Sequence, residues 1–245
     1  MDKKQKISVV IAAAGKGSRS GLSYPKCLHE INGTPILFKL LNNLEYWDPK
    51  PNIIVSPSGH QPIAQALSKK NCSCNLITQE TPKGMGDALL ELRRSSQHLE
   101  ENILLTWGDL PFISDETVQE LVKHFFEENS DFSLVTANTQ NPYTVVLRDA
   151  TQKIYKILET REMNEAVPHT SSERDIGVFL FKKDLILNFL EKPLDGKFGS
   201  ISGEHGFLYI IQHLVTQGFK VTSIETRRLI ETVSFNSPSD IAEYD

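Results

Sequence analysis

The first half of the chain alternates short apolar runs with segments whose apolar residues recur at helical spacing. The apolar runs predict strands over 7–11, 52–56, 74–78 and 102–107. The segments between and after them predict helices over 35–46, 61–69, 84–98 and 114–128. Four β-α repeats predict an α/β fold with a parallel, doubly wound sheet, which places ligands at the carboxyl ends of the strands.

The pattern changes near residue 135, where strand-like segments follow one another with fewer helices between them. We expect these strands over 131–138, 143–148, 154–159 and 176–181, then helices over 182–190 and 206–217, a strand over 220–225 and a last helix from Ser237. This change predicts a mixed, mostly parallel sheet flanked by helices. We therefore expect one domain over 1–245, with a first lobe over about 1–134 and a second over about 135–245.

The composition excludes some classes of protein but does not indicate a reaction. Hydrophobic residues make up 39% of the 245, and the formal net charge of -5 argues against a nucleic-acid surface, which would be basic. No apolar run approaches the ~20 residues of a membrane span, and the N-terminus lacks the apolar region of a signal peptide, so we expect a cytoplasmic protein. The three cysteines fit no disulfide framework. Lys26 could lower the pKa of Cys27, but we favour a packed thiol there.

A phosphate site is predicted directly after the first strand. Ala12, Ala13 and Ala14 are followed by Gly-Lys-Gly-Ser-Arg over 15–19, so the backbone can approach a ligand closely beside two cations. Pro25 restricts the chain before a further cation, Lys26. Two common phosphate motifs are excluded. A P-loop needs glycine where Val10 stands, and the dinucleotide fingerprint needs glycine where Ser20 stands.

The string A-A-G-K-G-S-R followed by P-K-C-L resembles the signature L-A-A-G-x-G-[TS]-R…P-K-x-L of nucleotidyltransferases that make nucleotide sugars. The continuation over 29–37 is most similar to the uridylyltransferase domain of N-acetylglucosamine-1-phosphate uridylyltransferases. The resemblance extends from about residue 7 to 240. It implies a Rossmann-like nucleotide-diphospho-sugar transferase fold, with the nucleotide in the first lobe and the acceptor in the second. The implied enzyme joins UTP to N-acetylglucosamine 1-phosphate and releases pyrophosphate.

The same resemblance assigns residues to the nucleotide and the metal. The implied nucleotide-binding residues are Ala13, Ala14, Gly15, Gly17, Ser18, Gln79, Gly84 and Gly108. Arg19 would hold the β- and γ-phosphates, and Lys26 would bridge the attacking phosphate and the α-phosphate. The segment W-G-D-L-P over 107–111 resembles the family's [YH]-G-D-x-P, and Asn236 matches a late asparagine. Asp109 and Asn236 would therefore hold Mg²⁺.

The implied acceptor residues depart from the family pattern. Glu159 ends a strand, as in the family, and would accept hydrogen bonds from sugar hydroxyls. Asp175 stands where the family has asparagine, and Thr144 stands where it has glycine. An ionised aspartate cannot donate a hydrogen bond to a substrate oxygen as an asparagine does. Met85 and Trp107 also replace the usual threonine and tyrosine or histidine on the nucleotide side.

Two other functions stay open. One is a cytidylyltransferase that acts on another phosphate-bearing acceptor, since Asp175 would suit a cationic or amine-bearing one. The other is a module that binds a nucleotide sugar without turnover, although Arg19, Lys26 and Asp109 argue against it. A glycosyltransferase is disfavoured because the chain has no Asp-x-Asp. The chain ends where bifunctional relatives would begin a hexapeptide β-helix, so we expect no acetyltransferase domain, and we make no prediction of oligomeric state.

Overall fold

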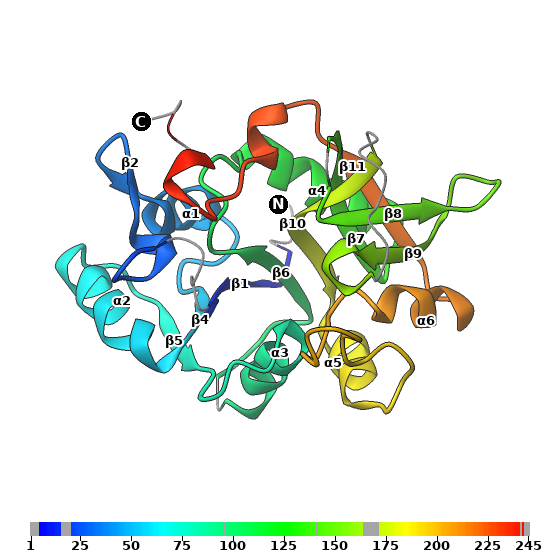
Figure 1. The fold of residues 1–245 in the computed structure, drawn as a ribbon, viewed down its shortest axis with the longest axis horizontal. Helices are drawn as coiled ribbons and strands as arrows, with labels where there is room; N and C mark the ends of the chain where they lie inside the picture. The colour runs from blue at the N-terminus through cyan, green and yellow to red at the C-terminus, as the bar shows by residue number, and fades with distance from the viewer. Residues whose placement is uncertain are drawn as a thin grey trace.

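The computed structural model describes residues 5–15, 21–95, 97–140, 142–163, 172–240 and 242. Its centre is a seven-stranded sheet in the order β11-β7-β10-β6-β1-β4-β5 (Figure 1). The strands are β1 (Ile7–Ala13), β4 (Asn52–Val55), β5 (Asn75–Thr78), β6 (Asn102–Trp107), β7 (Phe132–Thr139), β10 (Ser172–Lys182) and β11 (Val221–Glu225). All neighbouring pairs are parallel except those that β10 makes with β6 and β7. The predicted mixed, mostly parallel sheet is therefore confirmed.

Helices cover both faces of this sheet. They are α1 (Ile36–Leu44), α2 (Pro57–Lys69), α3 (Met85–Arg94), α4 (Asp115–Glu127), α5 (Lys183–Glu191) and α6 (Ile210–Thr216). In Figure 1, α3 and α5 lie on one side of the strands, and α1 and α4 lie on the other. This arrangement confirms the doubly wound fold.

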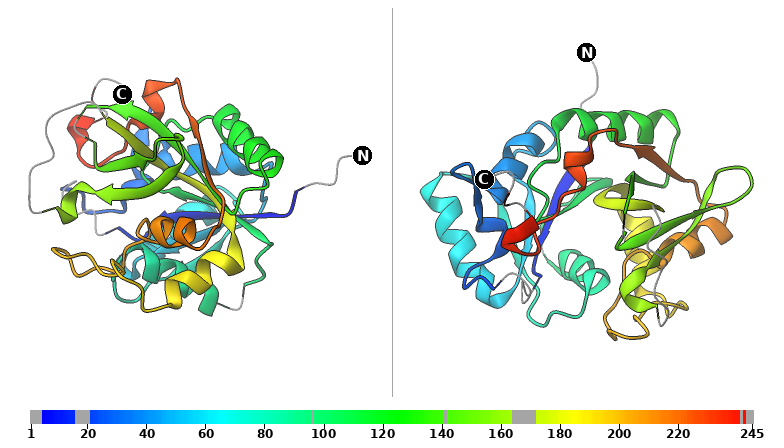
Figure 2. Two further views of the ribbon diagram at one scale, coloured as in Figure 1. Left: turned by 90° about the vertical axis from the view of Figure 1, so that its right-hand side faces the viewer. Right: turned by 45° about the horizontal axis from the view of Figure 1, so that its top comes forward.

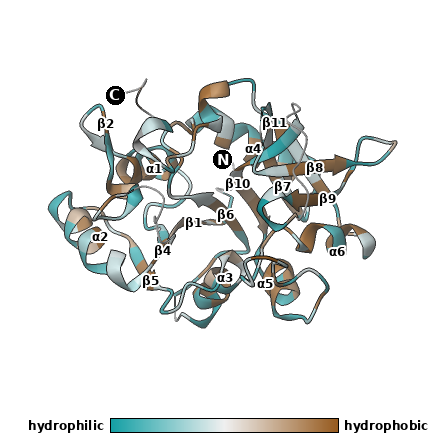
Figure 3. Ribbon diagram, viewed as in Figure 1, coloured by the Kyte–Doolittle hydropathy of each residue, from teal (hydrophilic) through white to brown (hydrophobic). Residues whose placement is uncertain are grey.

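Strand alternation explains why there are two hydrophobic cores. Val9 and Ile11 of β1 pack in the core beneath α1, α2 and α4, whereas Val10 packs in the core beneath α3, α5 and α6. Successive side chains of a strand point to opposite faces, so a continuous apolar run is what a strand covered on both faces requires. In Figure 3, hydrophobic colours are visible on α1 and α5 next to the sheet. No helix in the described ranges is long and apolar enough to span a membrane.

Short elements complete the fold. They are the paired strands β2 (Glu30–Ile31) and β3 (Thr34–Pro35), the hairpin β8 (Thr144–Arg148) and β9 (Ile154–Glu159), and the 3₁₀ turns η1 (Lys26–Leu28), η2 (Thr160–Glu162), η3 (Leu229–Thr232) and η4 (Pro238–Asp240). The loop of the β8–β9 hairpin projects from the body in Figures 1 and 2. Because β7, β10 and β11 continue the main sheet, the two-lobe division stays a prediction.

Several predicted helix bounds were wrong. The helix predicted to reach residue 98 ends at Arg94, because Ser95 is extended. The helix predicted from residue 206 begins at Ile210, because the amide of Gly206 bonds instead to the carbonyl of Lys197, across a loop. The helix predicted from Ser237 is only the single turn η4. In each case tertiary hydrogen bonds or the local backbone outweigh helical periodicity.

Candidate functional site

The candidate site lies at the carboxyl ends of β1 and β6, which are adjacent in the sheet. Ala12 pairs with Trp107, and the amide of Gly108 donates to the carbonyl of Ala12 at 2.9 Å. A Cβ at Gly108 would lie 3.0 Å from that carbonyl oxygen and 3.2 Å from the Cβ of Ala13. The close approach of the two strand ends therefore favours glycine at 108, and it brings Asp109 next to the turn that follows β1.

A cavity of about 440 Å³ opens at these strand ends. It is lined by Ala12, Ala14, Gly15, Lys26, Gln79, Gly84, Met85, Trp107, Asp109, Arg161 and Glu204, among others. Six of the predicted site residues therefore line one cavity, which we call the nucleotide cavity: Ala14, Gly15, Lys26, Gln79, Gly84 and Asp109. Ala13 and Gly108 lie directly behind it, in the strand ends. The predicted residues Gly17, Ser18 and Arg19 fall outside the described residues.

The far wall of the nucleotide cavity is fixed by Gln79, whose side chain is buried. Its amide donates to the carbonyl of Gly84 at 3.1 Å and to the Asp87 carboxylate at 3.0 Å. The sequence analysis missed Asp87. A carboxylate in the first turn of α3 also interacts favourably with the helix dipole. These two bonds leave the amide oxygen of Gln79 available as an acceptor toward a ligand.

Gly84 has a packing role that the sequence analysis did not predict. Its φ is +101°, and a Cβ there would lie 2.4 Å from the carbonyl oxygen of His205. The amide of His205 donates to Lys83, and the amide of Gly86 donates to His205 at 3.0 Å. Burial lowers the pKa of His205 to about 4, so its ring is neutral at pH 7. The loop that carries His205 is thus bonded to the segment predicted to contact the base.

Lys26, Asp109 and Asn236 converge at the mouth of the nucleotide cavity. The Lys26 ammonium Nζ lies 3.1 Å from Asn236 Oδ1 and 3.6 Å from Asp109 Oδ2. Lys26 opens η1 directly after Pro25, whereas Asp109 follows β6. Three residues distant in sequence, all predicted as site residues, therefore meet at one point.

The position of Asn236 is held by its neighbours. Its amide donates to Asp240 Oδ2 at 2.8 Å, and its side chain donates to Ser234 at 3.0 Å. The amide of Phe235 donates to the carbonyl of Asp109 at 2.8 Å, and the buried Phe235 ring stacks on His29 with centroids 4.4 Å apart. These contacts attach the late segment to β6 and aim the Asn236 oxygen at Lys26.

This donor set suits a hard divalent cation. Asp109 and Asn236 each direct a side-chain oxygen at the Lys26 ammonium. The two oxygens are therefore placed so that both can contact a single cation. Among the residues that the structure describes, no group of three or more His, Cys, Asp or Glu side chains could hold a metal. Two protein oxygens fit Mg²⁺, which usually keeps waters and takes further ligands from substrate phosphates.

A second cavity, of about 260 Å³, adjoins the first; we call it the acceptor cavity. Its lining includes Tyr143, Thr144, Glu159, Arg174, Asp175, Ser234 and Asn236, and it shares Trp107, Asp109 and Arg161 with the nucleotide cavity. All three predicted acceptor residues are therefore brought together. The two cavities meet at Asp109, beside the Lys26 ammonium.

The two departures from the family pattern, Thr144 and Asp175, contact each other. The hydroxyl of Thr144 donates to Asp175 Oδ1 at 2.5 Å, and the amide of Gly177 donates to Oδ2 at 3.0 Å. Burial raises the pKa of Asp175, and the Thr144 hydroxyl, the charge of Arg174 and the Gly177 amide partly offset the rise. Burial likewise raises the pKa of Glu159, against the opposing effect of Arg161. The acceptor cavity thus holds two carboxyl groups that burial disfavours in the charged form.

Trp107 separates the two cavities, and Gly177 makes room for it. The backbone at Gly177 has a φ of +83°, and a Cβ there would lie 2.1 Å from Cδ1 of the indole. The pairing register of β10 with β7 shifts between Asp175 and Phe179, around this glycine. The large indole is therefore accommodated by the absence of a side chain on the neighbouring strand.

Sequence reasoning missed two arginines. Arg161 lines both cavities and makes ion pairs with Glu204 at 3.0 Å and Glu159 at 3.2 Å. Arg174 lines the acceptor cavity next to Asp175. The alternating charges of E-T-R-E over 159–162, at the end of a strand, were a signal that could have indicated Arg161. No comparable signal distinguished Arg174.

Cys27 is a packed thiol, as we favoured. The side chain is buried, and burial raises the pKa of its thiol to about 12. Lys26 therefore does not turn its neighbour into a reactive thiolate, and its ammonium is directed at Asn236 and Asp109 instead.

A doubly wound sheet with two adjoining cavities at its strand ends is the architecture in which α/β proteins bind ligands at the topological switch point. The chain belongs to the MobA-like NTP transferase domain family, whose model matches residues 9–174. This match confirms the predicted nucleotidyltransferase resemblance at the level of the family.

Individual relatives agree with that assignment. The bifunctional protein GlmU of Buchnera aphidicola subsp. Schizaphis graminum is 36% identical over 163 residues, which are 66% of this chain and 34% of the relative. GlmU of Thermodesulfovibrio yellowstonii is 27% identical over 241 residues, 96% of this chain and 51% of the relative. The chain thus spans about half or less of these curated relatives.

Solved structures show the same fold. A putative glucose-1-phosphate thymidylyltransferase from Bacillus anthracis has a TM-score of 0.74 at 16% identity, with 97% of this chain and 93% of that chain covered. At this level of identity the likeness establishes the architecture.

Proposed function

We propose that the protein is a sugar-1-phosphate nucleotidyltransferase. It would join a nucleoside triphosphate, with UTP favoured, to a sugar 1-phosphate, with N-acetylglucosamine 1-phosphate favoured, and release pyrophosphate. The observation that carries this proposal is the convergence of Lys26, Asp109 and Asn236 where the nucleotide and acceptor cavities meet. Family membership and the GlmU relatives support it.

In this proposal the nucleotide occupies the first cavity. The small residues at the end of β1 and after it, namely Ala13, Ala14, Gly15, Gly17 and Ser18, would let the backbone amides approach the phosphates. Gln79 would accept a hydrogen bond from the edge of the base, and Gly84 would shape the wall beside it. Arg19 would hold the β- and γ-phosphates. Gly108 would leave room beside the α-phosphate.

The attacking group needs no general base, because a sugar 1-phosphate is already ionised at neutral pH. Its oxygen would attack the α-phosphorus in line, and pyrophosphate would leave. Lys26 would contact the attacking phosphate and the α-phosphate, so it would hold the two anions together. Mg²⁺ bound by Asp109 and Asn236 would supply further charge stabilisation on the phosphate oxygens.

The acceptor would bind in the second cavity. Glu159 would accept hydrogen bonds from sugar hydroxyls, and Thr144 and Asp175 would line the position of the 2-substituent. Because Thr144 already donates to Asp175, this pair presents a different surface from an asparagine opposite a glycine. A cytidylyltransferase with another phosphate-bearing acceptor is the alternative that Asp175 favours.

The decisive experiment is a pyrophosphate-release assay with Mg²⁺. UTP, CTP, ATP, GTP and dTTP would each be paired with N-acetylglucosamine 1-phosphate, glucose 1-phosphate and phosphocholine. Release with UTP and N-acetylglucosamine 1-phosphate is the expected result. Release with another substrate pair only would support the proposed reaction but change the assigned substrates. Tight binding of a nucleotide sugar with no turnover in any pair would identify a binding module and overturn the proposal.

A further inference from the structure

The acceptor cavity contains a buried arginine, Arg174, that forms no ion pair with any carboxylate in the described part of the chain. Arg174 lies on β10, and the whole residue is 8% exposed. Its Nε donates to the carbonyl of Asp175 at 3.0 Å, and its Nη2 donates to the carbonyl of Thr232 at 3.2 Å. Both acceptors are neutral backbone groups. Across the described ranges, no carboxylate lies within ion-pair distance, 4.0 Å, of this guanidinium, and its Nη1 has no hydrogen-bond partner.

This state contrasts with the other arginines nearby. Arg148 forms a paired interaction with Glu173, at 2.7 and 2.6 Å, and Arg161 pairs with Glu204. A buried charge is normally paired, because removing it from water costs free energy. Burial lowers the pKa of Arg174 although Asp175 opposes the change, which is the sign of an incompletely compensated cation. The Tyr143 ring, 5.3 Å from the guanidinium carbon, gives only partial compensation.

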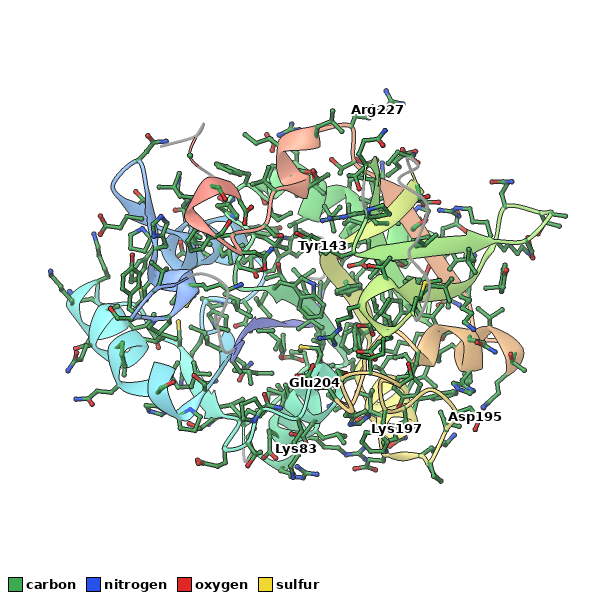
Figure 4. The ribbon with its side chains drawn as sticks, viewed as in Figure 1. Lys83, Tyr143, Asp195, Lys197, Glu204 and Arg227 are labelled. Atoms are coloured by element: carbon green, nitrogen blue, oxygen red, sulfur yellow. The ribbon has the colours of Figure 1, made fainter. Side chains whose placement is uncertain are left out.

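Arg174 lies at the acceptor cavity. Arg174 lines the acceptor cavity and not the nucleotide cavity, whereas Lys26 lines the nucleotide cavity and not the acceptor cavity. Lys26 and Arg174 are therefore placed to contact different parts of the bound substrates. Figure 4 labels Tyr143, the ring beneath Arg174, near the centre of the molecule, between α2 on one side and α6 on the other.

We propose that Arg174 binds a second anionic group on the acceptor, so that the acceptor is a sugar phosphate that also carries a carboxylate or a further phosphate. The inference rests on the proposed reaction, and it replaces the favoured acceptor, N-acetylglucosamine 1-phosphate, with a more acidic sugar phosphate. A planar guanidinium with free N–H groups matches the geometry of either anion. One such charged contact corresponds to discrimination of about 10- to 100-fold against a neutral analogue.

The same residues argue against a cationic acceptor. The Asp175 carboxylate already accepts from Thr144 and from Gly177, so both of its oxygens have donors. A cationic group would compete with these bonds and would also face Arg174. An anionic group would instead form an ion pair with a guanidinium that, among the described residues, has only the indirect electrostatic effect of Asp175 to offset its charge.

The test compares acceptors that differ only in the second group. Glucose 1-phosphate is the neutral reference, glucuronic acid 1-phosphate adds a carboxylate, and glucose 1,6-bisphosphate adds a phosphate. Binding would be measured by calorimetry, and kcat/KM by pyrophosphate release, for the wild type, Arg174→Met and Arg174→Lys. Arg148→Met is the matched control, because Arg148 lies on the same side of the fold but lines neither cavity. Thermal melting would confirm that each variant folds.

The expected result is that the wild type prefers one acidic acceptor over glucose 1-phosphate by about 10- to 100-fold. Arg174→Met should remove this preference while binding glucose 1-phosphate nearly unchanged, Arg174→Lys should keep part of it, and Arg148→Met should keep all of it. Which acid is preferred separates carboxylate from phosphate. Arg174-dependent preference in binding without turnover would sustain this inference and reject the proposed reaction. Equal binding of all three acceptors, or binding of none, would overturn the inference.

Discussion

The two cavities of the site are built in different ways. The nucleotide cavity is bounded largely by small residues and backbone, with Ala12, Ala14, Gly15 and Gly84 in its wall. The acceptor cavity is lined by charged and aromatic side chains, among them Arg174, Asp175 and Glu159. A wall of backbone would recognise the groups that all nucleotides share. Specificity for one acceptor is expected to reside in side chains, which can change while the fold is retained.

The largest effect is expected where the cavities meet. Lys26→Ala and Asp109→Ala should each lower kcat by about 10²–10³-fold, because each removes a charge that faces the reacting phosphates. Both variants should fold normally, since the two side chains lie at the mouth of a cavity. Pyrophosphate release with the best substrate pair measures the loss, and Lys123→Ala and Asp184→Ala, at exposed positions, are the controls. Near-wild-type activity in either site variant would remove that residue from the mechanism.

On the nucleotide side, Gly84→Ala should destabilise the protein by about 2 kcal/mol. The added Cβ would lie 2.4 Å from the carbonyl of His205, at a φ that favours glycine. We also expect weaker nucleotide binding, because Gln79 bonds to this residue. Chemical denaturation and nucleotide titration measure the two effects. Gly206→Ala is the matched control, because its nearest contact would be an ordinary 3.5 Å. Equal loss in both variants would show that the steric argument is wrong.

On the acceptor side, Asp175→Asn should change the pH dependence of stability. Burial raises the pKa of Asp175 in the folded protein, so the protonated form is the one that folding favours. The stabilisation that protonated Asp175 gives the folded state is therefore fully present below the ordinary aspartate pKa of about 4. It is lost as the pH rises through the higher pKa of the folded protein. The melting temperature of the variant, relative to wild type, should rise from pH 4 to pH 7. A difference that is constant with pH would contradict the shift.

The smallest effect on stability is expected for the ion pair between Arg161, which lines both cavities, and Glu204. The Arg161–Glu204 pair is partly exposed, with side-chain exposures of 56% and 35%, so its contribution to stability should stay below about 1 kcal/mol. A double-mutant cycle with Arg161→Met and Glu204→Gln, followed by denaturant unfolding, measures the coupling. A coupling above 2 kcal/mol would mean that this pair joins the two sides more firmly than its exposure implies.

Local sequence was sufficient for the repeating part of the fold. The four β-α repeats were predicted because each strand and helix has its own periodicity, and the resemblance selected Lys26, Asp109 and Asn236, which the structure brings together. The insertion of β10 between β6 and β7 was not predictable in this way. The position of β10 depends on pairing between segments that are far apart in the chain. Such pairing produces no periodic pattern in the sequence.

The contacts of the site show the same limit. Gly84 was chosen for access to a base, yet its most restrictive neighbour is His205, more than a hundred residues later. In the sequence Arg174 is one charge among many, whereas in the structure it is a buried guanidinium whose hydrogen-bond acceptors, among the described residues, are backbone carbonyls. The partner of a charged side chain is set by tertiary packing. It therefore cannot be predicted from the local sequence.

The fit of Trp107 against Gly177 also constrains how this site can evolve. The indole occupies the volume that any side chain at 177 would need, so the two positions cannot vary independently. A smaller ring at 107 would remove this clash, but the φ of +83° at position 177 would still favour glycine. Substitutions that reshape the boundary between the two cavities are therefore expected at position 107, while position 177 stays glycine.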